Sequence, residues 1–276
     1  MNTLITTLDG IMKVATNVAY LKKIIDSLIN NSFYSDWKTM ELCIQREGDE
    51  EILSEEGLEF DLNRIHQHFF SNLTSYRRID LFGEGENRFN FSILEPKQGN
   101  RNVQFGISFE LEEQYLMGKK ANQFADMVKG KLSAFIYPIS FTATVMYEEK
   151  DDPNYGSSIY SFERKYKIPK TGLSYGAVYW QYLTGQLEFQ DDYSVEVLEN
   201  APAFKKRHLQ KRIDGQPYHT FDYQIYDNPF EKTKEENLEM MREFFGYIRA
   251  ERIKLRKAGY KVQKEKTVLY LGTNSV

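Results

Sequence analysis

Apolar and polar residues follow two different rhythms along the chain, and the rhythm changes several times. Over residues 1–30, apolar side chains recur at spacings of three and four, which predicts one long amphipathic helix. The apolar stripe of that helix consists of Leu4, Leu8, Ile11, Ala15, Val18, Leu21, Ile25 and Leu28. The polar run at 30–32 then favours an end to the helix.

Alternation with a period of two predicts strands in much of the remaining chain. The clearest case is 103–111, where Val, Phe, Ile, Phe and Leu alternate with polar or small residues. Segments 76–82 and 88–94 flank a loop rich in Gly and Glu, which is typical of a β-hairpin. Further strands are predicted at 38–46, 139–147, 158–166, 193–198, 218–226 and 267–271.

Helical spacing returns in three later segments, at about 61–75, 112–135 and 231–257. Runs of strands between isolated helices indicate an α+β fold with mostly antiparallel sheet, a long N-terminal helix and a long helix near the C-terminus. A change of pattern near Pro138 divides the chain into an N-terminal half, 1–137, and a C-terminal half, 138–276. The two halves can also pack as one compact unit.

The composition indicates a cellular compartment for the protein and argues against some classes of protein. Cys43 is the one cysteine of the chain, so no intramolecular disulfide can form, and a reducing compartment is expected. No signal peptide is recognisable, and charged residues interrupt the most apolar early segment. We therefore expect a soluble, cytoplasmic protein with no membrane partner. The 14% aromatic content predicts a core rich in Tyr and Phe, with some Tyr left to contact partners.

Acidic residues gather in one early segment, 47–61, which contains eight Asp and Glu and neither Lys nor Arg. Such a block repels itself, which predicts a solvated loop. A basic partner would complement it, and we expect Glu50, Glu51, Glu55 and Glu56 to bind that partner.

Basic residues gather late in the chain. Segment 205–212 contains five Lys and Arg, and segment 249–266 contains eight with only two acids. The basic surface predicted from these segments consists of Lys205, Lys206, Arg207, Arg212, Arg249, Arg252, Arg256 and Lys257. Cations at a helix C-terminus are favoured by the helix dipole, but eight exceed what that effect needs. Nucleic acid, an acidic protein or a second copy of the chain would each complement such a surface.

Chemical motifs are scarce. Asp80, Glu95 and Lys97 match the Asp and Glu-x-Lys pattern with which many metal-dependent nucleases hold Mg²⁺ and steady a water molecule. Pro96 stands inside that pattern, and proline is poorly tolerated in a paired strand. The Asp/Glu-x-Lys tripeptide also recurs elsewhere in this highly charged sequence. No motif indicates zinc, another metal or a cofactor.

The resulting hypothesis is a non-catalytic intracellular interaction protein that binds another macromolecule through charged and aromatic surface. Regulator, inhibitor and immunity-type neutraliser are roles that fit. The main alternative is a nucleic-acid-binding protein that uses the basic segments, with or without metal-dependent nuclease activity. A third alternative is an enzyme whose site is assembled from scattered residues, because such a site leaves no linear trace.

Overall fold

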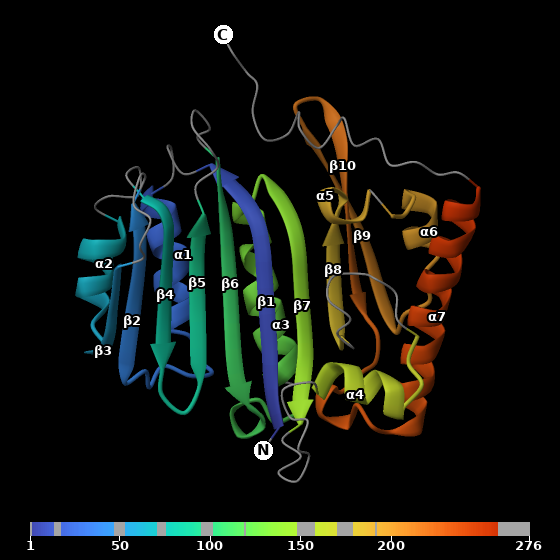
Figure 1. Cartoon of the computed structure of the whole chain (residues 1–276), viewed down its shortest axis with the longest axis horizontal. Coiled ribbons are helices and arrows are strands. Elements are labelled where there is room, and N and C mark those ends of the chain that lie inside the picture. The colour runs from blue at the N-terminus through green and yellow to red at the C-terminus, as the bar shows by residue number, and fades with distance from the viewer. Residues whose placement is uncertain are drawn as a thin grey trace. The chain divides into compact units, whose positions relative to one another are not determined.

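The structure is a computed structural model that describes residues 2–13, 18–46, 53–70, 76–94, 102–118, 120–147, 158–169, 179–190 and 192–258. Ten strands form one sheet in the order β3-β2-β4-β5-β6-β1-β7-β8-β10-β9, and helices accompany it (Figure 1). This confirms the predicted α+β fold with a large antiparallel sheet. None of the described helices is both long and apolar enough to cross a membrane.

The described chain divides into two compact units. The N-terminal unit comprises residues 6–138, and the C-terminal unit comprises residues 139–258 together with residues 2–5 of the first strand. The elements of the N-terminal unit are β1 (Asn2–Lys13), α1 (Val18–Ile29), β2 (Thr39–Arg46), β3 (Leu53–Glu59), α2 (Leu62–Phe70), β4 (Tyr76–Glu84), β5 (Arg88–Leu94), β6 (Asn102–Glu112) and α3 (Lys120–Lys129), with short 3-10 turns at Glu113–Tyr115 and Gly130–Ala134.

The core of the N-terminal unit is built on alternation in β5 and β6. Phe91, Phe105 and Phe109 are fully buried on one face of the sheet, and Phe109 packs edge-on against Phe124 of α3. The helices α1 and α3 lie behind the strands on this face (Figure 1). The predicted hairpin is confirmed, because β4 pairs antiparallel with β5 from Arg78–Leu94 to Glu84–Arg88. Strands with strict period two therefore form as the sequence predicts.

The prediction of one long N-terminal helix is wrong. Asn2–Lys13 is strand β1, and the helix α1 begins only at Val18. Leu4, Leu8 and Met12 are buried, and they fit a period of two as well as a period near four. Gly10 lies on the same side, where a Cβ atom would come within 2.2 Å of the Phe135 ring. A Gly packed tightly under a ring suits a strand better than a helix interior.

The C-terminal unit contains the strands from β7 to β9, which stand at one end of the strand order. Its elements are β7 (Tyr137–Tyr147), α4 (Ser158–Lys165), β8 (Gln181–Gly185), α5 (Gln186–Phe189), α6 (Val195–Glu199), β9 (Lys205–Ile213), β10 (Gln216–Gln224), a 3-10 turn (Pro229–Glu231) and α7 (Glu235–Lys257). The predicted long helix near the C-terminus is confirmed as α7, with 23 residues. Its buried Phe244 packs edge-on against Tyr223 of β10.

Three segments of the C-terminal unit differ from their predicted structure. Ser158–Lys165 and Val195–Glu199 are helices where strands were expected. Ser194 caps α6 by accepting a hydrogen bond from the Val197 N–H, a signal that outweighs the strand preference of the Val and Tyr residues nearby. Lys205–Ile213 is strand β9, which the hydrophobic pattern does not reveal. The expected strand at 267–271 lies outside the described residues.

Candidate functional site

The basic strand β9 is one arm of a tight hairpin at the end of the sheet. Asp214 and Gly215 connect β9 to β10, and both have positive φ values, 49° and 79°. Positive φ at both central residues is the mark of a type I′ turn, whose twist matches that of paired strands. β9 is last in the strand order, so among the described strands it pairs with β10 alone.

The side chains of β9 are displayed on both faces of this edge. Six consecutive residues, 205–210, are exposed, and the strand carries five Lys and Arg with no acid. One face, here called the leucine face, consists of Lys205, Arg207, Leu209, Lys211 and Ile213. The other, here called the histidine face, consists of Lys206, His208, Gln210 and Arg212. Leu209 is 47% exposed, so an apolar side chain stands between cations.

The turn also determines which backbone groups face outward. In a two-residue hairpin the pair beside the turn, Ile213 and Gln216, exchanges both backbone hydrogen bonds, and such pairs then alternate. Four residues therefore direct their N–H and C=O groups away from β10, namely Lys206, His208, Gln210 and Arg212. The N–H of His219, opposite Gln210, points away from β9 in the same manner and donates to Gln186 Oε1 at 3.1 Å.

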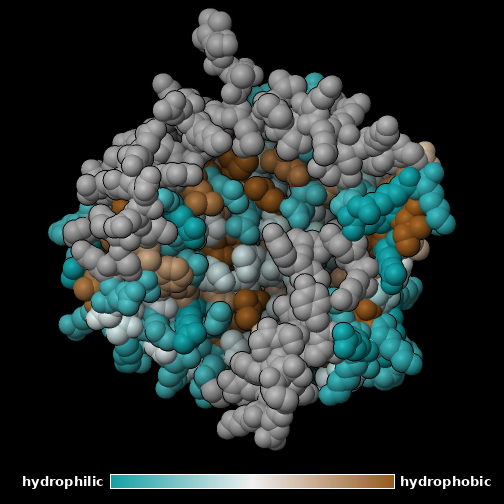
Figure 2. All heavy atoms as spheres, viewed as in Figure 1, coloured by the Kyte–Doolittle hydropathy of each residue, from teal (hydrophilic) through white to brown (hydrophobic). Residues whose placement is uncertain are grey.

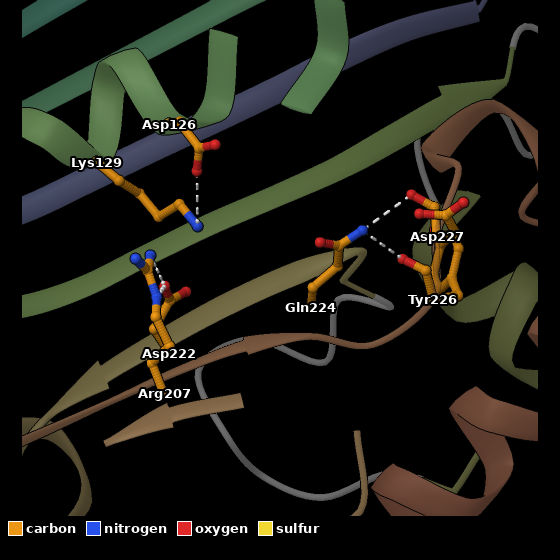
Figure 3. A network of polar contacts seen from close by, with 7 residues as sticks. All are labelled: Asp126, Lys129, Arg207, Asp222, Gln224, Tyr226 and Asp227. Atoms are coloured by element: carbon orange, nitrogen blue, oxygen red, sulfur yellow. Dashed lines mark hydrogen bonds and ion pairs between the residues drawn. The ribbon is translucent and has the colours of Figure 1, made fainter. Parts of the chain in front are cut away.

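Two cations of β9 are held in place by the unit itself. Arg207 donates to the carboxylate of Asp222, opposite it on β10, with an Nη2–Oδ2 distance of 2.5 Å (Figure 3). Asp222 is 5% exposed, so Arg207 balances a buried charge while its own side chain stays 62% exposed. Lys206 donates to the carbonyl groups of Glu199 and Ala201 at the end of α6, where the helix dipole favours a cation.

Two histidines and a glutamate meet on the histidine face. His208 Nε2 lies 2.9 Å from His219 Nδ1, and His208 Nδ1 lies 3.4 Å from Glu199 Oε1. The His208 ring also stacks on Phe221, 4.4 Å between centroids. Burial lowers the pKa of His219, and the neighbouring His208 lowers it further. A hydrogen bond between the two facing ring nitrogens requires one of them to carry the proton and the other to accept it.

The cations predicted on α7 fall into two groups. Arg252 and Arg256 both reach Asp192, with the closest Arg252 contact at 2.7 Å, so they secure the end of α7 to the segment before α6. Arg249 and Lys257 are exposed on the helix surface. Hydrophilic side chains predominate over α7 on the face shown in Figure 2. The basic residues thus include structural ion pairs as well as exposed charges.

The nuclease pattern is seen only in part. Asp80 is buried on β4, where Arg78 Nε lies 2.5 Å from its Oδ2 and Ser92 Oγ donates to its Oδ1 at 2.6 Å. Glu95 and Lys97 lie outside the described residues. Within the described part of the chain, no group of three His, Cys, Asp or Glu is arranged to hold a metal ion.

The acidic segment is not wholly a loop. Glu50 and Glu51 lie outside the described residues, whereas Glu55 and Glu56 belong to β3, the strand at the opposite end of the order from β9. Its pairing with β2 shifts register between Met40 and Leu42, and Gly57 has a φ of 66°. A register shift of this kind is a β-bulge, which interrupts the edge of β3.

A buried lysine was not foreseen from the sequence. Lys232 is 5% exposed, and its Nζ donates to the Val145 carbonyl at 3.3 Å and lies 4.2 Å from the centre of the Phe162 ring. Burial lowers the pKa of Lys232 to about 7, although the buried Glu163 acts in the opposite direction. Gly, Pro or motif signals could not have found it, because burial depends on how α4 and β7 pack.

Comparisons with known proteins leave the question of function to the chain's own geometry. No family model matches the sequence, and no curated protein matches it. Among solved structures, the chain is similar to the Pseudomonas aeruginosa T6SS protein PA0821, at 12% identity and a TM-score of 0.41, over 100% of this chain and 85% of that one. A similarity at this level carries no argument about function, so no family is assigned.

Proposed function

We propose that this is a non-catalytic intracellular interaction protein that binds an acidic macromolecule along the basic edge strand β9. The observation that carries the proposal is an exposed edge strand with five cations and no acid. A regulator, an inhibitor and an immunity-type neutraliser all act by such binding. An acidic protein fits better than a small ligand, because the cations extend along nine residues of strand.

Protection against aggregation is the competing explanation for the cations. Charged residues on an edge strand, Lys above all, prevent other chains from pairing with it. That role needs charge of either sign, whereas recognition of an acidic partner needs positive charge. Reversing the sign therefore separates the two explanations.

The first prediction concerns the double variant Lys205→Glu/Arg212→Glu. Both residues are exposed, and neither makes an ion pair with another described residue, so the fold should tolerate the change. The variant should stay soluble and lose at least about tenfold in affinity for an acidic partner, since charged contacts are worth roughly 1 kcal/mol or more each. Binding of partners captured from the native cell extract, quantified against the wild type, provides the measurement.

A matched control is Arg249→Glu/Lys257→Glu, which makes the same change of charge on α7. If this control weakens binding as strongly as the β9 variant, net charge rather than β9 determines affinity. Unchanged affinity of the β9 variant would remove β9 from the proposal.

Nucleic acid is the second candidate partner, because phosphates also complement exposed cations. The supporting observation is Phe204, which is 43% exposed next to Lys205, with the ammonium 5.3 Å from its ring centre. An exposed ring beside a cation can stack on a base while the cation binds phosphate. Fluorescence anisotropy with labelled single-stranded and duplex DNA, across a range of salt, tests this directly. Binding that weakens steeply with salt supports this alternative, and no binding at low salt eliminates it.

The acidic residues remain a separate proposal, for a basic partner. Glu56 and Glu59 are exposed on β3, and Glu50, Glu51 and Glu55 belong to the same segment. Replacing the acids of this segment with Ser or Asn should weaken binding of a basic partner. Unchanged affinity would exclude the segment from any interface.

A further inference from the structure

The edge of β9 is suited to pairing with another strand, and the edge of β3 is not. The register between β9 and β10 runs without a shift over nine pairs, from Lys205–Gln224 to Ile213–Gln216. β9 contains no proline, and no described strand covers its outer side. In contrast, the bulge at Gly57 breaks β3 into two short stretches. A straight edge of this length is what β-augmentation by a partner strand requires.

The outward backbone groups supply the hydrogen bonds for such pairing. Every second residue of β9, from Lys206 to Arg212, presents one N–H and one C=O outward, as derived above from the type I′ turn. These groups lie at the spacing of a sheet ladder, so only an extended polypeptide can satisfy all of them together. A DNA backbone carries no matching row of donors, because its phosphates only accept hydrogen bonds.

The side chains of the leucine face indicate which residues the added strand carries. Arg207, Leu209 and Lys211 follow one another on this face, so an apolar side chain stands between two cations. Residues opposite each other on neighbouring strands have their Cβ atoms about 4.5–5.5 Å apart and interact directly. The complementary strand is therefore acidic, apolar and acidic at alternate positions.

Resting on the binding role proposed above for β9, we propose that the partner is an extended acidic segment of another polypeptide, which adds to the sheet as a strand beside β9. Its carboxylates lie opposite Lys211 and Arg207, and its central apolar residue packs on Leu209. Arg207 also binds Asp222, but its side chain is 62% exposed and can contact a second carboxylate. On the histidine face, Arg212 provides a further cation, while Lys206 is already bound to the end of α6. A second copy of this chain is a poorer partner, because its acidic edge strand is interrupted by the bulge.

The experiment uses three labelled peptides of nine residues, the length of β9. Glu and Thr alternate along each peptide, and Val replaces the central Glu. One is unmodified, and the other two carry N-methyl groups on alternate amides, in opposite phases. In an added strand only every second amide faces β9. We expect binding of the unmodified peptide, a loss of at least about tenfold for one methylated phase, and little change for the other.

A variant of the protein provides the reciprocal test. The Gln210 N–H faces outward, so Gln210→Pro removes a donor and blocks the edge while leaving the β9–β10 ladder intact. We expect Gln210→Pro to weaken binding of the unmodified peptide at least about tenfold, and Gln210→Thr, which keeps the N–H, to bind as the wild type. Circular dichroism and thermal unfolding of both variants report whether the hairpin is retained. If Gln210→Pro does not fold, the two methylated peptides still decide the question.

The outcomes separate this inference from the function on which it rests. Equal affinity of both methylated peptides would overturn strand addition and leave acidic binding by β9 in place. Failure of every acidic ligand to bind would overturn both. Tighter binding of single-stranded DNA than of the peptide would replace the polypeptide partner with a nucleic acid. Sedimentation could also show that the wild type self-associates and that Gln210→Pro abolishes this. The partner would then be a second copy of the chain.

Discussion

The ammonium group of Lys232 illustrates how one residue can carry an unusual free-energy cost. In the unfolded chain a lysine has a pKa near 10.5, whereas burial lowers the pKa of Lys232 to about 7 in the folded protein. Between these two values the unfolded state binds more protons than the folded state. The free energy of unfolding therefore rises with pH through this window, and below pH 7 the full cost of burying the charge remains.

This leads to a prediction for Lys232→Met. Between pH 7 and 9 the wild type should gain roughly 2 kcal/mol of stability from Lys232, because the slope approaches 1.36 kcal/mol per pH unit when one proton is released on folding. Lys232→Met should lack this gain. Urea unfolding at several pH values measures this gain in the free energy of unfolding. The pH range stops below the ordinary pKa of tyrosine, because burial raises the pKa of Tyr223 and Tyr193. At higher pH these tyrosines would make the free energy of unfolding fall with pH.

The control for this prediction is Lys234→Met. Lys234 is exposed, and its hydrogen bond to Glu231 raises its pKa, so it titrates above the chosen window. Its replacement should leave the slope unchanged. The same slope in Lys232→Met as in the wild type would show that Lys232 is charged in the folded protein at neutral pH.

Among the elements, the hairpin of β9 and β10 depends on its turn. Gly215 has a φ of 79°, and a Cβ atom there would meet no other atom within 4 Å. Gly215→Ala therefore introduces backbone strain of about 1–2 kcal/mol without a steric clash. We expect faster amide hydrogen exchange across β9 and β10, and weaker binding at the β9 edge.

Gly118 provides the matched control. Its φ is 70°, and a Cβ atom there would also find open space, but it lies between the 3-10 turn after β6 and α3. Gly118→Ala should lower global stability by a similar amount and leave exchange in β9 unaltered. An equal effect of both substitutions on β9 would mean that the turn does not control the hairpin.

The sequence predicts elements well where one period is clearly favoured. In β6, Phe105, Ile107 and Phe109 fit only a period of two, and the strand forms as predicted. In β1, Leu4 and Leu8 fit both periods, and the interpretation as a helix is wrong because tertiary packing of Gly10 under Phe135 decides the structure. β9 is exposed on both faces, so it has no hydrophobic rhythm. The Asp-Gly pair after it was the available signal.

The candidate site could be predicted only at the level of charge. The sequence locates the cations of 205–212, but it does not tell which of them are bound internally. Arg207 is bound to Asp222 because the hairpin places those residues opposite each other. Arg252 is bound to Asp192, 60 residues away, through the packing of α7. Such pairings depend on register and tertiary structure, for which a single sequence carries no direct signal.

For the molecule as a whole, the net charge of −4 is the sum of unevenly distributed charges. The two edge strands have opposite signs, because β3 is acidic and β9 is basic. Like edges repel each other, and the bulge in β3 hinders pairing of unlike edges. If β9 binds a partner as proposed, this arrangement leaves its long edge open and disfavours pairing between copies of the chain. We therefore expect the distribution of charge, more than its total, to govern association.

A last prediction follows for neutral replacements. Changing Lys205, Lys211 and Arg212 together to Thr removes charge from β9 and increases its β propensity, so this variant should self-associate through the edge. Lys205→Glu/Arg212→Glu changes the net charge from −4 to −8, because each reversal changes the charge by two, and should not associate more than the wild type. Light scattering after gel filtration over a range of concentrations compares them. A monomeric Thr variant would show that charge is not what keeps this edge open.

The two-residue turn at Asp214 and Gly215 has a consequence for how related chains can diverge. Exposed loops normally tolerate changes of length. Here a shift of one residue in the pairing would exchange the two faces of β9 and turn the other set of amides outward. The length of the turn thus sets the register of β9 against β10, and with it the side chains and amides that β9 presents at its outer edge. A single-residue insertion in the turn would leave the composition of β9 intact and yet change which side chains and amides face a binding partner.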